Sequence, residues 1–95
     1  MHIISRKTLR SFWQKYPDSQ TALIRWFKII QRTNFASFAD LRATFPSADQ
    51  VGNLIVFNIG GNKYRLISSI HFNRHKIYIR SVLTHKEYTQ GDWKS

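Results

Sequence analysis

The stretch VFNIGGNKYRLI, residues 56–67, predicts a β-hairpin at the centre of the fold. Two runs rich in β-branched and aromatic residues flank Gly60-Gly61-Asn62, and Gly and Asn accept the positive φ of a tight hairpin turn. Lys63 and Arg65 open the second run, two positions apart, so alternation predicts that they share one face of the strand. This hairpin therefore has a cationic patch that ordinary packing does not require.

The hairpin extends into a predicted three-stranded antiparallel meander over residues 54–59, 64–72 and 76–83, because these runs are short, β-rich and separated by turn residues. On the second strand, the residues predicted to face the core are Tyr64, Leu66, Ile70 and Phe72. The opposite, open face is predicted to hold Lys63, Arg65, Ile67, Ser69 and His71. On the third strand, the predicted core set is Ile77, Ile79, Ser81 and Leu83, and the predicted open set is Tyr78, Arg80, Val82 and Thr84.

The residues before the hairpin predict helices. Leu9, Phe12, Trp13 and Tyr16 follow helical spacing, with Ser5 as the expected N-cap and Pro17 marking the end. Leu23, Trp26, Phe27 and Ile30 repeat this spacing after Asp18, the expected N-cap of a second helix. Shorter helical turns are predicted at 37–43 and, as a turn or tail, at 85–93.

The order of these segments predicts an α+β fold in a single domain, residues 1–95. In it, two N-terminal helices pack on one face of a small antiparallel sheet of about three strands.

The amino-acid composition limits the classes of function and the partners that are possible for this chain. The chain has no Cys, which excludes disulfides, a thiol nucleophile and thiolate metal ligands and suits a reducing compartment. No apolar segment follows the first cations, and no run is long enough to cross a membrane, so we expect a cytoplasmic protein without membrane contact. The net charge is +10 on 95 residues, which favours a polyanionic partner such as nucleic acid or a ribosomal surface.

The residue types at the hairpin and after the last strand suit RNA cleavage without a metal or cofactor. There is no HExxH motif, no close pair of carboxylates and no Walker loop. Metal-free cleavage needs a base, an acid and a cation on the phosphate. Arg65 suits the phosphate because its planar fork binds two oxygens, and His85 or Tyr88 suits proton transfer. The candidates for holding the RNA are Lys63, Arg80, Lys86 and Asn62.

Each of these residues also has an ordinary structural explanation. Cations on strands discourage edge-to-edge pairing, a single histidine is usually structural, and Tyr88 can pack against the core with Trp93. A non-catalytic basic module that docks RNA or DNA is therefore an alternative. An enzyme would lose turnover sharply at one or two positions, whereas a binding module would lose affinity gradually with each cation removed.

Several motifs together resemble the HigB-type toxins of bacterial type II toxin-antitoxin systems, within the RelE-like superfamily. The motifs are Val56-Phe57-Asn58-Ile59-Gly60-Gly61-Asn62, Arg65, Tyr78-Ile79-Arg80 and Thr84-His85-Lys86-Glu87-Tyr88. Met1-His2-Ile3-Ile4, Lys15-Tyr16-Pro17 and Phe45-Pro46-Ser47 extend the resemblance over nearly the whole chain.

The resemblance implies a ribosome-dependent mRNA endoribonuclease that cuts message in the A site of the 70S ribosome and is neutralised by a HigA-type helix-turn-helix antitoxin. It also implies a compact α+β fold, and an arginine after the hairpin turn that contacts the scissile phosphate, which matches Arg65. Lys86 and Tyr88 match assisting residues near the C-terminus. Thr89 departs from the pattern, since Asp is expected there, and leaves open a folded but inactive toxin.

Overall fold

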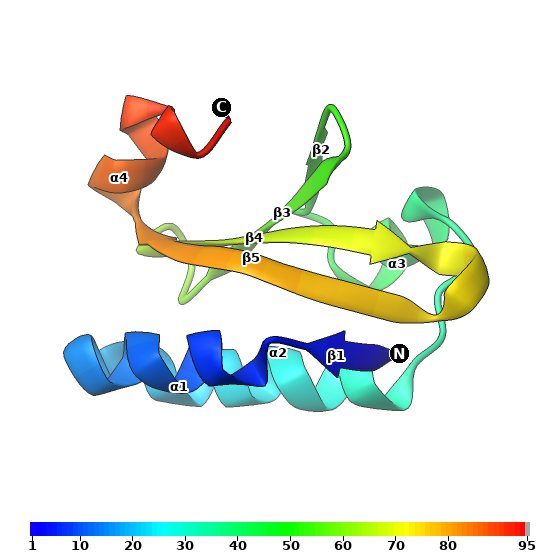
Figure 1. Cartoon of the computed structure of the whole chain (residues 1–95), viewed down its shortest axis with the longest axis horizontal. Helices are drawn as coiled ribbons and strands as arrows, with labels where there is room; N and C mark the ends of the chain where they lie inside the picture. The colour runs from blue at the N-terminus through cyan, green and yellow to red at the C-terminus, as the bar shows by residue number, and fades with distance from the viewer. Residues whose placement is uncertain (95) are drawn as a thin grey trace.

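The computed structural model describes residues 1–94. The two longest helices pack on one face of a mixed five-stranded sheet (Figure 1). The helices are α1 (Arg6–Lys15), α2 (Gln20–Arg32), α3 (Phe38–Thr44) and α4 (His85–Gln90). The strands are β1 (His2–Ile4), β2 (Asp49–Val51), β3 (Leu54–Ile59), β4 (Tyr64–His71) and β5 (Lys76–Thr84). Short 3₁₀ turns are η1 (Pro17–Ser19), η2 (Phe72–Arg74) and η3 (Asp92–Lys94). Within residues 1–94, no helix has the length and apolarity to cross a membrane.

The sheet has the order β1-β5-β4-β3-β2, and its centre is the predicted meander β3-β4-β5. The α+β class is confirmed, but the expectation of about three antiparallel strands is wrong. β1 and β2 add a short strand at each edge, and β1 runs parallel to β5. Each added strand has only three residues, which is too few for alternation to stand out in the sequence.

A β-bulge changes which residues of β5 face the helices. Ile67 pairs with Ser81 and Ser68 pairs with Ile79, so Arg80 is left between two partners and the alternation slips by one residue. Val82 is therefore buried in the core at 8% exposure, whereas Leu83 lies opposite Arg65 on the other face. The predicted placement of Val82, Ser81 and Leu83 is wrong for this reason.

The face of the sheet away from α1 and α2 is not open over its whole length. Val56, Arg65 and Ile67 alternate onto this face and are all buried. Figure 1 shows that β2 and α4 rise on this same side of β4 and β5. The prediction of an open face is therefore wrong for Arg65 and Ile67, although it holds for the exposed His71.

The predicted helices α1, α2 and α3 are confirmed, but two of their predicted caps are not. Ser5 adopts a left-handed φ of 74° and makes no side-chain capping bond. Asp18 lies in η1, one residue before the N-cap Ser19, whose Oγ donates to the Tyr16 carbonyl at 2.6 Å. By contrast, Ser37 caps α3 by accepting a hydrogen bond from the backbone of Asp40 at 3.1 Å.

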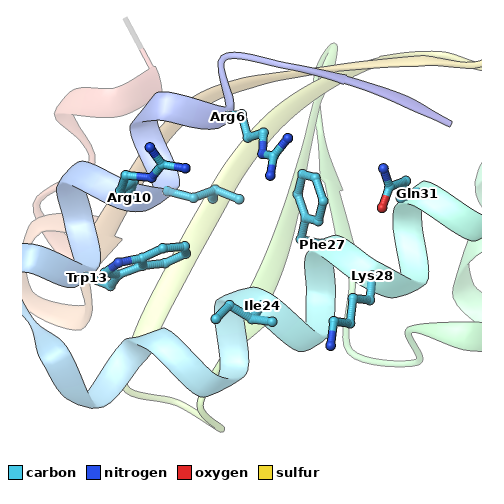
Figure 2. A pocket seen from close by; sticks show the side chains of 8 residues that line it. Arg6, Arg10, Trp13, Ile24, Phe27, Lys28 and Gln31 are labelled. Carbon is cyan, nitrogen blue, oxygen red and sulfur yellow. The ribbon is translucent and has the colours of Figure 1, made fainter.

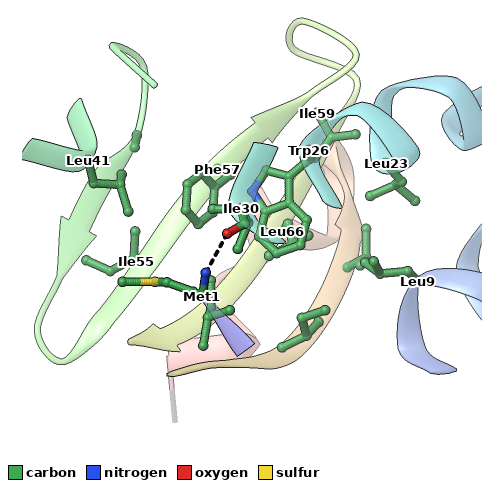
Figure 3. Close-up of a cluster of buried hydrophobic side chains, with 14 of the residues drawn as sticks. Met1, Leu9, Leu23, Trp26, Ile30, Leu41, Ile55, Phe57, Ile59 and Leu66 are labelled. Atoms are coloured by element: carbon green, nitrogen blue, oxygen red, sulfur yellow. Dashed lines mark hydrogen bonds between the residues drawn. The ribbon is translucent and has the colours of Figure 1, made fainter. Parts of the chain in front are cut away.

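The core lies between the helical layer and the sheet (Figure 3). Its fully buried members include Leu23 and Ile30 of α2 and Leu66 of β4. The amine of Met1 donates to the carbonyls of Ile30 and Thr33, both at 2.8 Å, at the end of α2. The Ile30 carbonyl also accepts from the Thr33 backbone amide at 3.3 Å, so the amine adds to the hydrogen bonds at the C-terminal end of α2, where a positive group is favourable. Burial lowers the pKa of this amine, and the contact fastens β1 beside α2.

Candidate functional site

The candidate site forms where the hairpin turn meets α4, and Arg65 lies at its centre. Arg65 is the second residue of β4 and is only 8% exposed. Its Nη1 donates to the Tyr64 carbonyl at 3.1 Å, and its Nη2 lies 3.5 Å from Oδ1 of Asn62. Both acceptors are neutral, so they orient the guanidinium without cancelling its charge. An oriented, uncancelled cation is what recognition of a phosphate requires.

Helix α4 is fixed beside the turn by hydrogen bonds at its N-terminus. Thr84 and Glu87 form a reciprocal capping box, with Glu87 N donating to Thr84 Oγ1 at 3.2 Å and Thr84 N to Glu87 Oε1 at 3.0 Å. The His85 backbone amide donates to the Lys63 carbonyl at 3.1 Å. The Thr-His-Lys-Glu sequence thus starts a helix at the point where β5 ends next to the hairpin turn.

This placement of α4 brings Tyr88 over Arg65, with 5.2 Å from the guanidinium carbon to the ring centroid. Trp93 stacks on the same tyrosine at 5.0 Å between ring centroids and an interplanar angle of 13°, and its Nε1 donates to the Tyr88 carbonyl at 2.9 Å. Between α4 and Trp93, Gly91 reverses the chain with a φ of 80°. Arg65 and Tyr88, two of the candidate site residues, therefore meet in a cation–π contact.

His85 is exposed at the start of α4, three residues before Tyr88. The Thr89 hydroxyl donates to the His85 carbonyl at 2.8 Å and lies 3.2 Å from Nδ1 of the imidazole. Thr89, which departs from the expected family pattern, therefore holds the histidine ring. This role of Thr89 was not predicted from the sequence, although the four-residue spacing of His85 and Thr89 in a helical turn was a usable signal.

The structure separates the two hairpin cations that the sequence placed on one face. The Lys63 ammonium binds Asp18 Oδ2 at 2.8 Å, and the Tyr64 phenol donates to Asp18 Oδ1 at 2.6 Å. Asp18 belongs to η1 on the helical side of the sheet, whereas Arg65 contacts α4 on the other side. Lys63 lies in the turn, where strand alternation does not apply, and the carboxylate attracts it.

These contacts also shift two pKa values. The hydrogen bond to Asp18 raises the pKa of Tyr64 to about 12, with burial adding to the effect. Hydrogen bonds from Lys63 and Tyr64 lower the pKa of the Asp18 carboxyl. The Lys63 ammonium therefore has a carboxylate partner of its own, and it stays exposed in this pair.

Of the remaining residues predicted to contact RNA, Asn62 lies beside Arg65, with its Oδ1 3.5 Å from Nη2 of the guanidinium. Asn62, Arg80 and Lys86 are all exposed, in the turn, at the bulge and on α4 respectively. Their contacts with RNA stay predictions. Across the described residues 1–94, no three His, Asp or Glu side chains gather as a metal site would need.

Comparison with known proteins places this architecture in one group. Residues 19–91 match the profile of the family HigB_toxin, described as the RelE-like toxic component of a toxin-antitoxin system. A relative from Escherichia coli (strain K12), named mRNA interferase toxin HigB, is 41% identical over 91 residues, which cover 93% of this chain and 88% of the relative. The mRNA interferase HigB of Shigella flexneri has the same identity and coverage, and that of Escherichia coli O6:H1 is 31% identical with the same coverage.

Proposed function

Because the chain belongs to the HigB family, the RelE-like toxic component of toxin-antitoxin systems, we propose that it acts as a cytoplasmic toxin that cleaves messenger RNA. It is an mRNA endoribonuclease, as the names of its relatives indicate. Its substrate is message engaged on the 70S ribosome, and its net charge of +10 speeds association with ribosomal RNA. Its antitoxin is a HigA-type helix-turn-helix protein.

The observation that carries this proposal is the buried Arg65 guanidinium, held by neutral groups beside Tyr88. Cleavage begins when a base removes the proton of a ribose 2′-hydroxyl and the 2′-oxygen attacks the neighbouring phosphorus. The bond to the 5′-oxygen breaks, and that oxygen takes up a proton. Arg65 stabilises the charge that grows on the phosphate oxygens, and its fixed orientation means that little reorganisation is needed at that moment.

Proton transfer falls to His85 or Tyr88. Thr89 engages Nδ1 of the His85 imidazole, so we assign proton transfer to the other ring nitrogen, Nε2. Tyr88 lies against Arg65, where its phenol can donate a proton or its ring can stack on a base. Asn62, Arg80 and Lys86 hold the RNA backbone, Lys63 being paired with Asp18 on the helical side, and no metal or cofactor takes part.

Alanine substitution at Arg65 and at His85 tests these roles. We expect Arg65→Ala to slow cleavage of ribosome-bound message by about 10²–10³, the usual effect of losing one transition-state donor. Arg65→Lys retains the positive charge but loses the planar fork of the guanidinium. Its cleavage rate should therefore lie between that of the parent and that of Arg65→Ala. Arg74→Ala removes an exposed cation in η2 at the far end of β4 and should cleave like the parent.

Binding measured in the same variants separates an enzyme from a docking module. If the protein is an enzyme, the affinity of these variants for the ribosome should stay nearly constant while their rate of message cleavage falls. A gradual and equal loss of affinity with each cation removed would instead favour a non-catalytic module. If Arg65→Ala and His85→Ala both cleave message like the parent, the assigned site is wrong.

A further inference from the structure

Helices α1 and α2 carry several exposed cations and no acidic residue. These cations are Arg6, Lys7, Arg10, Lys15, Arg25, Lys28 and Arg32. None of the five acidic residues of the chain lies within α1 or α2. Figure 1 shows these helices on the opposite side of the sheet from α4, so this surface lies apart from the candidate active site.

A groove with an apolar floor runs between α1 and α2 (Figure 2). It encloses about 290 Å³, with Leu9, Trp13, Ile24 and Phe27 at its base and Arg10 and Lys28 among its lining residues. Trp13, Ile24 and Phe27 are each partly exposed. The combination of partly exposed apolar side chains with cations at the edge is unusual for a helical face that only covers a sheet.

We infer that this groove, which we call the helical groove, is the docking site of an acidic amphipathic helix of the antitoxin. The inference rests on the proposed function, since a toxin of this family has an antitoxin partner. An apolar ridge of such a helix would pack on the floor, as a third helix packs between two others. Asp and Glu on either side of that ridge would then meet Arg10 and Lys28.

The apolar floor favours a protein helix over RNA in this groove. A phosphate backbone would meet the cations but would leave the apolar floor without a partner that removes it from water.

Charge reversal at the edge of the groove tests the inference. The test variant is Arg10→Glu/Lys28→Glu, and the matched control, Arg42→Glu/Arg74→Glu, makes the same charge change at exposed cations elsewhere. Binding of purified toxin to the antitoxin of the same pair is measured by calorimetry. We expect the test variant to lose at least about tenfold in affinity, and its affinity to depend less on salt than that of the parent. The control should stay within about twofold of the parent.

A second variant tests the floor of the groove. Ile24→Asp places a carboxylate against the expected apolar ridge and should also weaken binding, while thermal melting checks that the variant remains folded. Unchanged affinity in both test variants would overturn the inference. So would a loss of ribosome binding with unchanged antitoxin affinity, because the helical groove would then be an RNA surface. A parent protein that fails to cleave message would overturn the proposed function, yet calorimetry would still decide the docking site.

Discussion

Asp18 is the residue that decides how the charges near the hairpin turn are arranged. Its carboxylate binds both Lys63 and the Tyr64 phenol, residues 45 and 46 positions later in the chain. One acid at the corner between α1 and α2 thus holds the first hairpin cation on the helical side. Arg65 is then the cation left on the side of α4. The sequence predicted Asp18 as a helix cap, because a local acceptor role is visible in a sequence and a distant partner is not.

The same contact predicts a pH dependence of stability at both extremes. The pKa of Tyr64 is raised to about 12, so between pH 10 and 12 the folded state keeps a proton that the unfolded state loses. The free energy of unfolding should therefore fall as pH rises through this window. The pKa of Asp18 is lowered from 3.8, so stability should also fall as pH drops below that value.

Urea denaturation of the parent and of Asp18→Asn at neutral, alkaline and acid pH checks this prediction. The free energy of unfolding of the variant should fall less steeply than that of the parent at both acid and alkaline pH. Absorbance titration should place the ionisation of Tyr64 in the variant nearer to pH 10. Equal pH profiles for the two proteins would show that the Asp18 contact does not form in solution.

At the scale of the elements, α4 has only six residues, and its stability depends on interactions near its two ends. An isolated helix of this length is unstable in water, so the capping box at Thr84 and the packing of Tyr88 must hold it. Because Tyr88 meets Arg65 only while α4 is formed, the order of the candidate site depends on this short helix.

Removing the cap should therefore affect activity more than global stability. Thr84→Ala deletes the hydroxyl that accepts from Glu87, which costs about 1 kcal/mol of local helix stability. We expect faster amide exchange in α4, a change in Trp93 fluorescence and slower message cleavage, with a melting temperature close to that of the parent. Thr84→Ser keeps the hydroxyl and serves as control. Equal exchange rates in α4 of the alanine variant and the parent would contradict this dependence.

The elements predicted best from the sequence were the long periodic ones. The strands β3, β4 and β5 and helix α3 lie within about a residue of their predicted bounds, and α1 and α2 contain the predicted apolar positions, because regular apolar spacing follows from burial on one face. The faces of Val82 and Leu83 could not be predicted, since the bulge at Arg80 depends on the partner strand. At the site, Arg65 and Tyr88 are two candidate residues that lie in contact, whereas Lys63 was misplaced because turns do not alternate.

At the scale of the whole molecule, the sheet separates two surfaces with different charge arrangements. On the helical side, α1 and α2 carry exposed cations and no acidic residue, whereas the α4 side concentrates one oriented cation with an imidazole and a phenol. This separation lets one surface hold a protein partner while the other meets the substrate.

The order of the sheet predicts that its N-terminal part cannot be stable alone. β5 lies between β1 and β4, so residues 2–4 reach their partners only through residues 76–78. We expect a fragment of residues 1–75 to lack a cooperative melting transition and to be digested rapidly by protease, in contrast to the whole chain. A fragment that melts cooperatively would show that the helices and β2-β3-β4 suffice.

This arrangement has a consequence for the cell that makes the protein. A nascent chain leaves its ribosome from the N-terminus, so β5, the strand that joins β1 to the rest of the sheet, emerges after the other four strands. The groups proposed to cut RNA are assembled only after that strand is in place. The newly made toxin can therefore attack a transcript, its own included, only after β5 and α4 have left the ribosome.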